Sequence, residues 1–165
     1  TVRKGNIFIY YGEGKGKTTL AIGQGIRAVG EGLSVIMIQF LDYNNTKEGI
    51  PLKALEPDFR IFRFEKIREN INEFDDNTKK DILMEIKNAF NFTRKIIETG
   101  ECDVLILDGI IEAVEKEYIS KEDLCYILSK KEAYMDIILT GTSVDDLLKE
   151  KSDYVYKISK EKVPN

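Results

Sequence analysis

The segment YYGEGKGKTT, residues 10–19, contains most of a phosphate-binding loop. The usual loop has a glycine, four residues of any type, and then glycine, lysine and serine or threonine. Residues 16–18 fit the second half, but Tyr11 holds the position of the first glycine and Gly12 follows one step too late. The loop is shorter than the usual pattern, so its surroundings have to decide whether it binds phosphate.

The segments on either side are those that a phosphate-binding loop requires. Residues 6–11 form a short apolar and aromatic run, which is typical of a buried strand. Residues 17–30 have apolar side chains at helical spacing, and Gly30 is expected to end the helix. A glycine-rich turn without a ligand is the alternative, but the strand and the helix favour a nucleotide site.

In such a site each residue type has a known chemical use. Glycines let backbone N–H groups point at phosphate, and the helix N-terminus adds partial positive charge. Lys17 is expected to contact phosphate oxygens and the Thr18 hydroxyl to bind Mg²⁺, so these two are the predicted catalytic residues. The residues of the loop predicted to bind ATP are Gly12, Glu13, Gly14, Lys15, Gly16, Lys17, Thr18 and Thr19.

The rest of the chain alternates further strands with helices. Apolar runs predict strands at residues 33–40, 59–64, 103–109, 135–141 and 154–159, the second of them at a sheet edge. Helical patterns cover residues 76–100, 121–131 and 144–151, with Asp75 or Asp76, Ser120 and Ser143 as N-caps. We therefore expect one domain over residues 1–165 with an α/β, P-loop NTPase-like fold: about six mainly parallel strands with helices on both faces.

Sheets of this kind bind ligands at the carboxyl ends of their strands. Four polar segments follow strands and should converge at that edge: residues 12–19, 39–45, 108–109 and 140–143. Asp108 ends the apolar run VLILD and is predicted to bind the metal ion together with Thr18. The alternative for Asp108 is a carboxylate that only caps the loop after its strand.

The composition narrows the chemistry. The 165 residues carry a net charge of −4 and no histidine, which excludes Ser-His-Asp and Cys-His catalysis. The acidic balance gives no reason to expect a nucleic acid partner. No apolar run reaches the ~20 residues of a membrane span, the first residues have no apolar signal region behind them, and the two cysteines lack metal-ligand spacing. We expect a reduced, cytoplasmic protein.

One family shares these features. The run YGEGKGKTTLAIGQGIRAVGEG (residues 11–32), followed by VIMIQF (35–40), resembles the P-loop type of corrinoid adenosyltransferase, the cob(I)alamin adenosyltransferase family. That family has a Gly-x-Gly-Lys-Gly-Lys-Thr-Thr loop, a helix containing an arginine, here Arg27, and a strand ending in Gln-Phe, here Gln39-Phe40. A weaker resemblance continues through CDVLILD, YISKEDLCYIL and IILTG, and so covers most of the chain.

The resemblance implies a substrate pair and a reaction in cobalamin biosynthesis or salvage. In the family, the short loop holds ATP and Mg²⁺ with the phosphate chain running in the reverse direction, and cobalt(I) of a reduced corrinoid attacks the ribose C5′ so that triphosphate leaves. Arg27 joins the predicted ATP-binding residues on this basis, and a homodimer is expected. Cobalt(I) is already a strong nucleophile, so the absence of a histidine base fits this chemistry.

Several positions depart from the family pattern. The glutamate that usually follows the strand aspartate is Gly109, and Thr-Gly-Arg is replaced by residues 140–142, Thr-Gly-Thr. We expect Gly109→Glu to raise activity if the side chain has room. The Gly-Phe-Thr-Trp segment is missing, so the apolar side chains that displace the lower cobalt ligand would come from other aromatic residues, which are otherwise ordinary core: Phe59, Phe62, Phe64 and Phe74.

Two other functions stay open. The first is an ATP-binding relative that senses or carries a nucleotide or corrinoid without transfer, which Gly109 and Thr142 favour. The second is a P-loop kinase or ATPase, against which the short loop and the missing water-orienting acid count.

Overall fold

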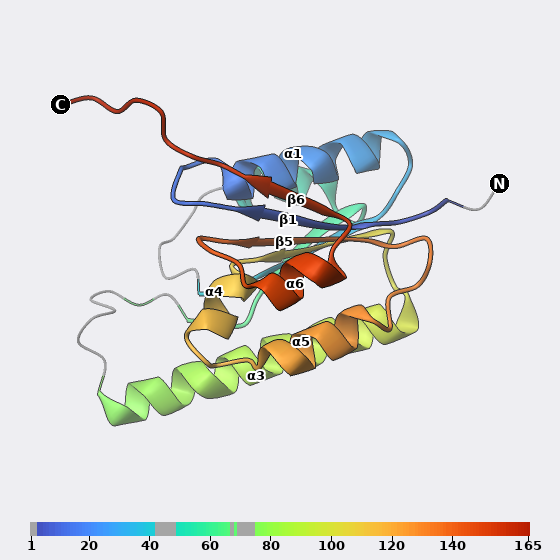
Figure 1. Cartoon of the computed structure of the whole chain (residues 1–165). Helices are drawn as coiled ribbons and strands as arrows, with labels where there is room; N and C mark the ends of the chain where they lie inside the picture. Colours follow the sequence, from blue (N-terminus) through green and yellow to red (C-terminus); the bar gives the residue numbers. More distant parts are fainter. Residues whose placement is uncertain (1–2, 42–48, 67, 69–74) are drawn as a thin grey trace.

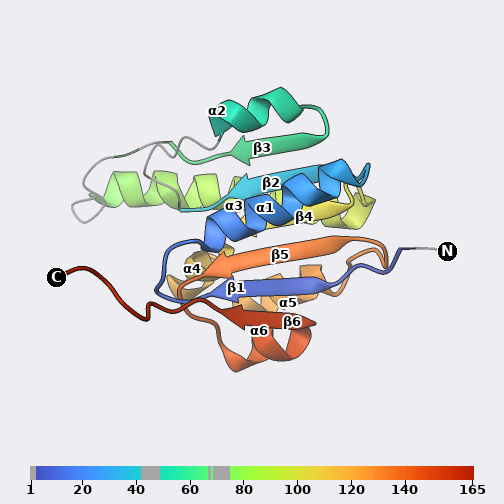
Figure 2. The same cartoon turned by 90° about the horizontal axis from the view of Figure 1, so that it is seen from above.

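The computed structural model describes residues 3–41, 49–66, 68 and 75–165. Within this part of the chain, six parallel strands form one sheet in the order β3-β2-β4-β5-β1-β6 (Figures 1 and 2). The strands are β1 (Ile7–Tyr11), β2 (Val35–Gln39), β3 (Phe59–Arg63), β4 (Val104–Asp108), β5 (Asp136–Gly141) and β6 (Tyr154–Lys157). The predicted fold class is confirmed, the third strand lies at an edge, and every described pair is parallel.

Helices cover both faces of the sheet (Figure 1). One face carries α1 (Lys17–Gly30), and the short α2 (Gly49–Leu52) and the 3₁₀ turn at Lys53–Leu55 contribute Leu52 and Leu55 to the same core. The opposite face carries α3 (Asp76–Thr99), α4 (Ile110–Glu115), α5 (Lys121–Leu128) and α6 (Asp146–Lys151). The sequence did not predict α4 or α2, because six and four residues are too few to establish a helical period.

The alternation of side chains along each strand builds two separate cores. In β2, Val35 and Met37 pack in the core under α1, whereas Ile36 and Ile38 pack in the core under α3. Helix α1 lies close to the sheet at Gly25, because this residue has no side chain. A Cβ there would stand 2.6 Å from the Phe59 ring. Both faces of the central strands are therefore dry, and polar groups are confined to the strand ends.

The helix ends test the predicted caps. Asp75 accepts a hydrogen bond from the Thr78 amide at 2.7 Å, and Ser120 accepts one from the Asp123 amide at 3.0 Å, so both caps are confirmed. Ser143 as an N-cap is wrong: α6 begins two residues later, and Asp145 accepts from the Leu148 amide at 2.9 Å.

The end of α1 also differs slightly from the prediction. The helix runs through Gly30 and the chain reverses at Gly32, whose φ is 84°. The Leu33 amide then bonds to the Ala28 carbonyl at 2.9 Å. The glycine with the left-handed conformation is thus the later of the two, as in other glycine-terminated helices.

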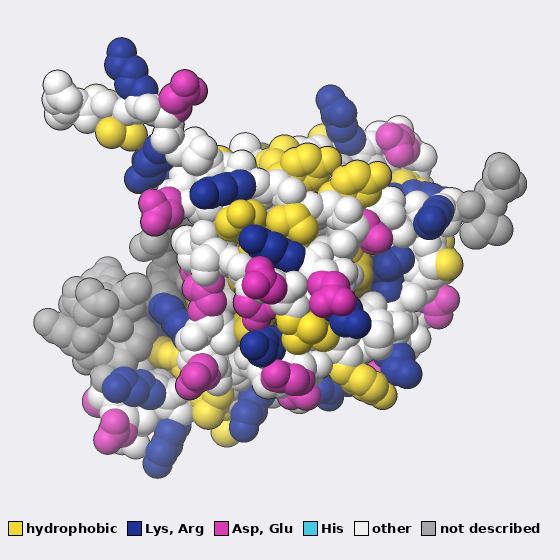
Figure 3. Space-filling view, in the orientation of Figure 1, with side chains coloured by type: hydrophobic (Ala, Val, Ile, Leu, Met, Phe, Trp, Pro, Cys, Tyr) yellow, Lys and Arg dark blue, Asp and Glu magenta, His cyan; other side chains and the backbone are white. Residues whose placement is uncertain are grey.

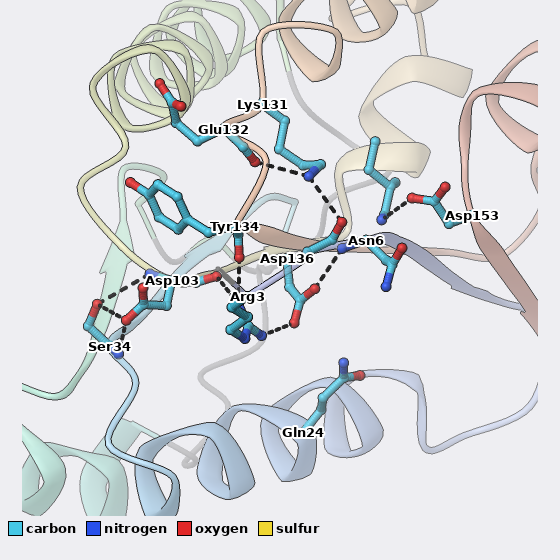
Figure 4. Close-up of polar contacts among 12 residues, drawn as sticks. Arg3, Asn6, Gln24, Ser34, Asp103, Lys131, Glu132, Tyr134, Asp136 and Asp153 are labelled. Atoms are coloured by element: carbon cyan, nitrogen blue, oxygen red, sulfur yellow. Dashed lines mark hydrogen bonds and ion pairs between the residues drawn. The ribbon is translucent and has the colours of Figure 1, made fainter. Parts of the chain in front are cut away.

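The amino ends of the strands are joined by a network of polar contacts (Figure 4). The Arg3 guanidinium binds the Asp136 carboxylate and donates to the Tyr134 carbonyl at 2.6 Å. Asp136 also accepts from the Asn6 amide at 2.7 Å, and Asp103 accepts from the Ser34 amide at 2.9 Å. These contacts tie the segment before β1 to the starts of β4 and β5.

The visible surface has no region of a single charge: acidic and basic side chains alternate over it (Figure 3). Among the described residues, no helix combines the length and apolar character needed to cross a bilayer.

Candidate functional site

The phosphate-binding loop joins the carboxyl end of β1 to the first turn of α1, as its sequence pattern predicts. Gly16 is the residue before the helix, with φ 110°, and its carbonyl accepts the first helical hydrogen bond from the Leu20 amide at 2.8 Å. A Cβ at Gly16 would meet no atom within 4 Å, so the glycine is required by its backbone conformation and not by crowding.

Gly12 has a different reason to be glycine. Its φ is 134°, and a Cβ there would overlap the carbonyl oxygen of Ile158, which follows β6. The Ile158 amide bonds to the Tyr11 carbonyl at 2.7 Å, and the Gly12 amide bonds to the Gly141 carbonyl at 3.2 Å. The glycine that lies one step late in the sequence therefore lets the loop fit between the ends of β5 and β6.

The Lys17 ammonium lies against the loop that precedes it. It donates to the Gly12 carbonyl at 2.6 Å and to the Gly14 carbonyl at 2.9 Å. The side chain is therefore folded back toward the start of the loop, and its charge is held against the segment that is predicted to bind phosphate. Three other predicted residues of this segment, Glu13, Lys15 and Thr19, are exposed.

Two hydroxyl groups converge on the Asp108 carboxylate at the end of β4. Thr18 donates to Oδ1 at 2.8 Å, and Thr140, at the end of β5, donates to the same oxygen at 2.7 Å. The Thr140 hydroxyl in turn accepts from the Gly109 amide at 2.8 Å. Helix α1 crosses over β5 to reach β4, so Thr18 and Asp108 meet although 90 residues separate them.

Thr140 was missed as a site residue. Its segment was expected at the carboxyl edge, but only the strand order places β5 between β1 and β4 and so brings this hydroxyl to Asp108.

This group of oxygens fits a magnesium ion. Mg²⁺ is bound in nucleotide sites by one or two protein oxygens, with water and substrate phosphates completing the octahedron. Thr18 Oγ1 and Asp108 Oδ1 are hard oxygen donors 2.8 Å apart at the start of a helix that follows a phosphate-binding loop.

The residue after Asp108 corrects one expectation. Gly109 has φ 80°, and a Cβ there would overlap the Phe40 carbonyl oxygen. A glutamate at this position has no room in this backbone, so the expected gain of activity in Gly109→Glu is not supported. The nearby carboxyl group is Glu112, in the first turn of α4. Burial raises the pKa of Glu112, whereas the charges of Lys116 and Lys17 oppose this, so it lies within the field of the Lys17 ammonium.

Arg27 is not brought to the loop. It lies exposed in the last turn of α1, ten residues after Lys17, which is about 15 Å along the helix axis. Its predicted contact with ATP finds no support in this placement within one chain.

The phenylalanines proposed to cover the corrinoid lie in different surroundings. Phe59 is buried at 1% exposure under α1 and is ordinary core, whereas Phe62 and Phe64 are partly buried and pack on Phe92 of α3. Phe74 and residues 42–45, also predicted near the site, lie outside the described residues.

Solved structures share this fold. The flagellar accessory protein FlaH from Methanocaldococcus jannaschii has a TM-score of 0.62 and 17% identity, over 94% of this chain and 72% of its own. A KaiC-like protein from Pyrococcus horikoshii has a TM-score of 0.58 and 16% identity, over 97% and 75%. At these identities the likeness establishes the architecture alone.

Comparison of sequences goes further. The Escherichia coli K12 protein named corrinoid adenosyltransferase is 24% identical over 155 residues, which are 94% of this chain and 76% of the relative. The Salmonella typhimurium corrinoid adenosyltransferase CobA is 26% identical over 84% of this chain and 68% of its own. The model of the family described as ATP:corrinoid adenosyltransferase BtuR/CobO/CobP matches residues 3–165. With the shortened loop, the Thr18–Asp108 pair and this match in agreement, the chain belongs to the corrinoid adenosyltransferase family.

Proposed function

We propose that this protein transfers the 5′-deoxyadenosyl group of ATP to cobalt(I) of a reduced corrinoid and releases triphosphate. Cobalt(I) supplies the electron pair of the new cobalt–carbon bond, the C5′–oxygen bond breaks, and its electron pair leaves with triphosphate. The observation that carries the proposal is the shortened phosphate-binding loop, with Lys17 folded against it and the Thr18–Asp108 pair beside it.

The residues of the chain act on the leaving group and not on the nucleophile. Backbone N–H groups of residues 12–19 and the Lys17 ammonium would bind the triphosphate oxygens and stabilise the charge that develops on them. Thr18 and Asp108 would hold Mg²⁺, which supplies further neutralisation of the triphosphate charge. No histidine or other protein base is needed, because the reaction removes no proton from the corrinoid.

The direction of ATP in the loop follows from the family resemblance and is part of the proposal. The γ-phosphate is expected deep in the loop, and the ribose C5′ near the carboxyl end of β2, after Phe40. A nucleotide-bound crystal structure tests this directly. ATP in the ordinary orientation, with the γ-phosphate at the reacting edge, would instead support a kinase or ATPase.

A second candidate function is an ATP-binding protein without transferase activity. Gly109 favours it, because the chain lacks a carboxylate directly after Asp108 and the backbone leaves no space for one. Thr142 in place of the family's arginine favours it too. Both functions predict MgATP binding, so binding alone does not separate them.

The deciding experiment mixes the protein with MgATP and a corrinoid reduced to cobalt(I). The transferase should produce the light-sensitive alkylcobalt absorbance spectrum and one triphosphate per cobalt–carbon bond, with no ADP. ATP binding without either product would establish the second function.

The family resemblance also supports a homodimer as the active form. Sedimentation equilibrium over a range of protein concentrations, with and without MgATP, measures this separately from activity.

A further inference from the structure

A buried carboxyl group lies at the carboxyl edge of the sheet and has no role in the chemistry proposed above. Glu65 follows β3 by two residues and is 3% exposed. Its Oε1 accepts a hydrogen bond from the Leu41 amide at 2.8 Å, while its Oε2 is buried without a hydrogen-bond partner among the described residues. A carboxyl group that is desolvated and half-satisfied destabilises a fold, so its presence calls for an explanation.

The partner of Glu65 has an unusual backbone. Leu41 has φ 55°, one of two non-glycine residues with positive φ among those described. Leucine has no intrinsic preference for this left-handed conformation, so a contact from outside the residue has to hold it. The hydrogen bond from the Leu41 amide to Glu65 is such a contact.

The turn that Glu65 holds contacts the backbone of Asp108 and Gly109, next to the proposed metal site. The Phe40 amide donates to the Asp108 carbonyl at 2.8 Å. The Phe40 carbonyl lies so close to Gly109 that a Cβ there would overlap it, and the Gly109 amide bonds to Thr140. Contacts therefore run from Glu65 through the backbone of Leu41 and Phe40 to the residues that place the Asp108 carboxylate.

The charges that face Glu65 come from α3 and from β3 with the residues that follow it. Burial raises the pKa of Glu65 to about 7, and repulsion from Glu85 of α3 adds to this. The Leu41 amide, Arg68 and Arg63 oppose the rise. Arg68 is shared, because its guanidinium also pairs with Glu85 at 2.8 Å. Glu65 therefore changes its charge in the neutral range, unlike an exposed glutamate.

We propose that Glu65 is a positioning residue for the adenosyl-transfer site: through the Leu41 amide it fixes the Phe40–Leu41 turn against Gly109 and so sets the place of the metal-binding Asp108. Its catalytic consequence rests on the proposed function, whereas its structural consequence does not. An ionised carboxylate accepts a stronger hydrogen bond than a neutral acid, so the turn is held best when Glu65 is charged.

The structural part is tested by ¹⁵N–¹H NMR of the Leu41 amide between pH 5 and 9. In the native protein this resonance should move with a midpoint near the Glu65 pKa of about 7. In Glu65→Gln the movement should vanish. Glu85→Gln should shift the midpoint to lower pH, because it removes a repelling charge and frees Arg68. Glu98→Gln, the same change on an exposed position of α3, should behave as the native protein.

The functional part is measured at 25 °C as MgATP affinity, metal-free ATP affinity and kcat/KM for adenosyl transfer. Glu65→Gln should weaken MgATP binding and not metal-free ATP binding, because the turn acts on Asp108. It should lower kcat/KM at pH 8 by roughly 10-fold to 10²-fold, the range that follows small displacements of reacting groups. In the native protein kcat/KM should rise through neutral pH as Glu65 ionises, and in Glu65→Gln this rise should be absent. Glu65→Asp, which restores the charge, should recover part of the loss.

The outcomes separate the two proposals. A Leu41 resonance that does not titrate, or a Glu65→Gln variant with native MgATP affinity and a native pH profile, overturns the positioning role. If the native protein forms no alkylcobalt product but the Leu41 titration and the loss of MgATP affinity appear, the transferase fails and the positioning of Asp108 stands.

Discussion

The two ends of this parallel sheet use the same residue type in different ways. At the amino end, Asp136 binds a guanidinium and the Asn6 backbone amide, groups that cannot leave without unfolding the start of the chain. At the carboxyl end, Asp108 accepts hydrogen bonds from two side-chain hydroxyls, Thr18 and Thr140. A hydroxyl can turn to a metal ion or a phosphate at little cost, whereas a backbone amide cannot. The kind of partner therefore distinguishes a structural aspartate from one available for a ligand.

Lys17→Ala should give the largest functional effect at the carboxyl end. Within the described part of the chain, the Lys17 ammonium donates hydrogen bonds only to two loop carbonyls, so its loss should leave the unfolding free energy nearly unchanged while removing the charge that stabilises triphosphate. The rate of adenosyl transfer should fall by about 10²–10³-fold. Initial rates and the thermal shift with MgATP measure this, with exposed Lys95→Ala as the control. A large loss of stability in Lys17→Ala would mean that the carboxyl end of the sheet, like the amino end, depends on its charged side chains for folding.

Asp136→Ala should give the opposite pattern at the amino end. It leaves the Arg3 guanidinium and the Asn6 amide without their acceptor, which should lower the unfolding free energy by about 2–3 kcal/mol. Activity per folded molecule should not change, because the carboxyl edge is at the other end of β5. Urea denaturation followed by circular dichroism measures the loss. Reduced MgATP affinity in the folded variant would show that the two ends are coupled.

Glu65 predicts how stability depends on pH. Its pKa in the folded protein, about 7, is above the ordinary value of 4.5, so the folded state binds the proton more tightly than the unfolded state. The stability from this group is fully present below pH 4.5 and is lost as pH rises through 7, by at most about 3 kcal/mol. Urea denaturation at several pH values should show a flatter profile in Glu65→Gln, which should be more stable than the native protein at pH 8. Equal slopes for both would contradict the raised pKa.

Most of the fold was predictable because buried parallel strands have continuous apolar runs. The strand, glycine-rich loop and helix over residues 6–30 also have a distinctive spacing of glycines, lysine and threonine. Asp108 and Thr18 were predictable for the same reason: Asp108 ends an apolar strand, and Thr18 belongs to the loop-to-helix pattern that follows another strand. The cap at Ser143 failed because three residues of capping type stand within 143–146, and sequence alone does not choose among them.

Other site features depend on distances across the fold. Thr140 required the strand order, and Gly109 required the position of the Phe40 carbonyl. The sequence predicts an ordinary surface glutamate at Glu65, because no neighbouring residue indicates that it packs against the turn after β2. Arg27 was assigned from resemblance, although its place ten residues after Lys17 in the predicted helix already sets it about 15 Å from the loop along the helix axis.

Gly109→Glu tests how tightly the carboxyl edge is built. With φ 80° and the Phe40 carbonyl in the way, any side chain at Gly109 should lower the unfolding free energy by about 1–3 kcal/mol and reduce transfer. Gly23→Ala is the matched control, since a Cβ there meets no atom within 4 Å and the residue lies inside α1, so it should raise stability by about 1 kcal/mol. Increased transfer in Gly109→Glu would mean that the turn after β2 moves when substrates bind.

Asp145→Ala should give the smallest effect and separates structure from function within the carboxyl edge itself. Asp145 follows β5 by four residues, as a ligand-binding residue could, but its carboxylate accepts from the Leu148 amide at 2.9 Å and so resembles the aspartates of the amino end. Its loss should cost about 1 kcal/mol of stability, the usual value of an N-cap, and leave MgATP affinity unchanged. Ser143→Ala, in the same loop, should cost less because Ser143 caps no helix in the described structure and its hydroxyl donates to the exposed Glu115 carboxylate. Urea denaturation and MgATP titration of both variants decide the matter: if Asp145→Ala weakens MgATP binding while its stability stays native, then a backbone partner does not mark a structural aspartate, and the division between the two ends of the sheet fails.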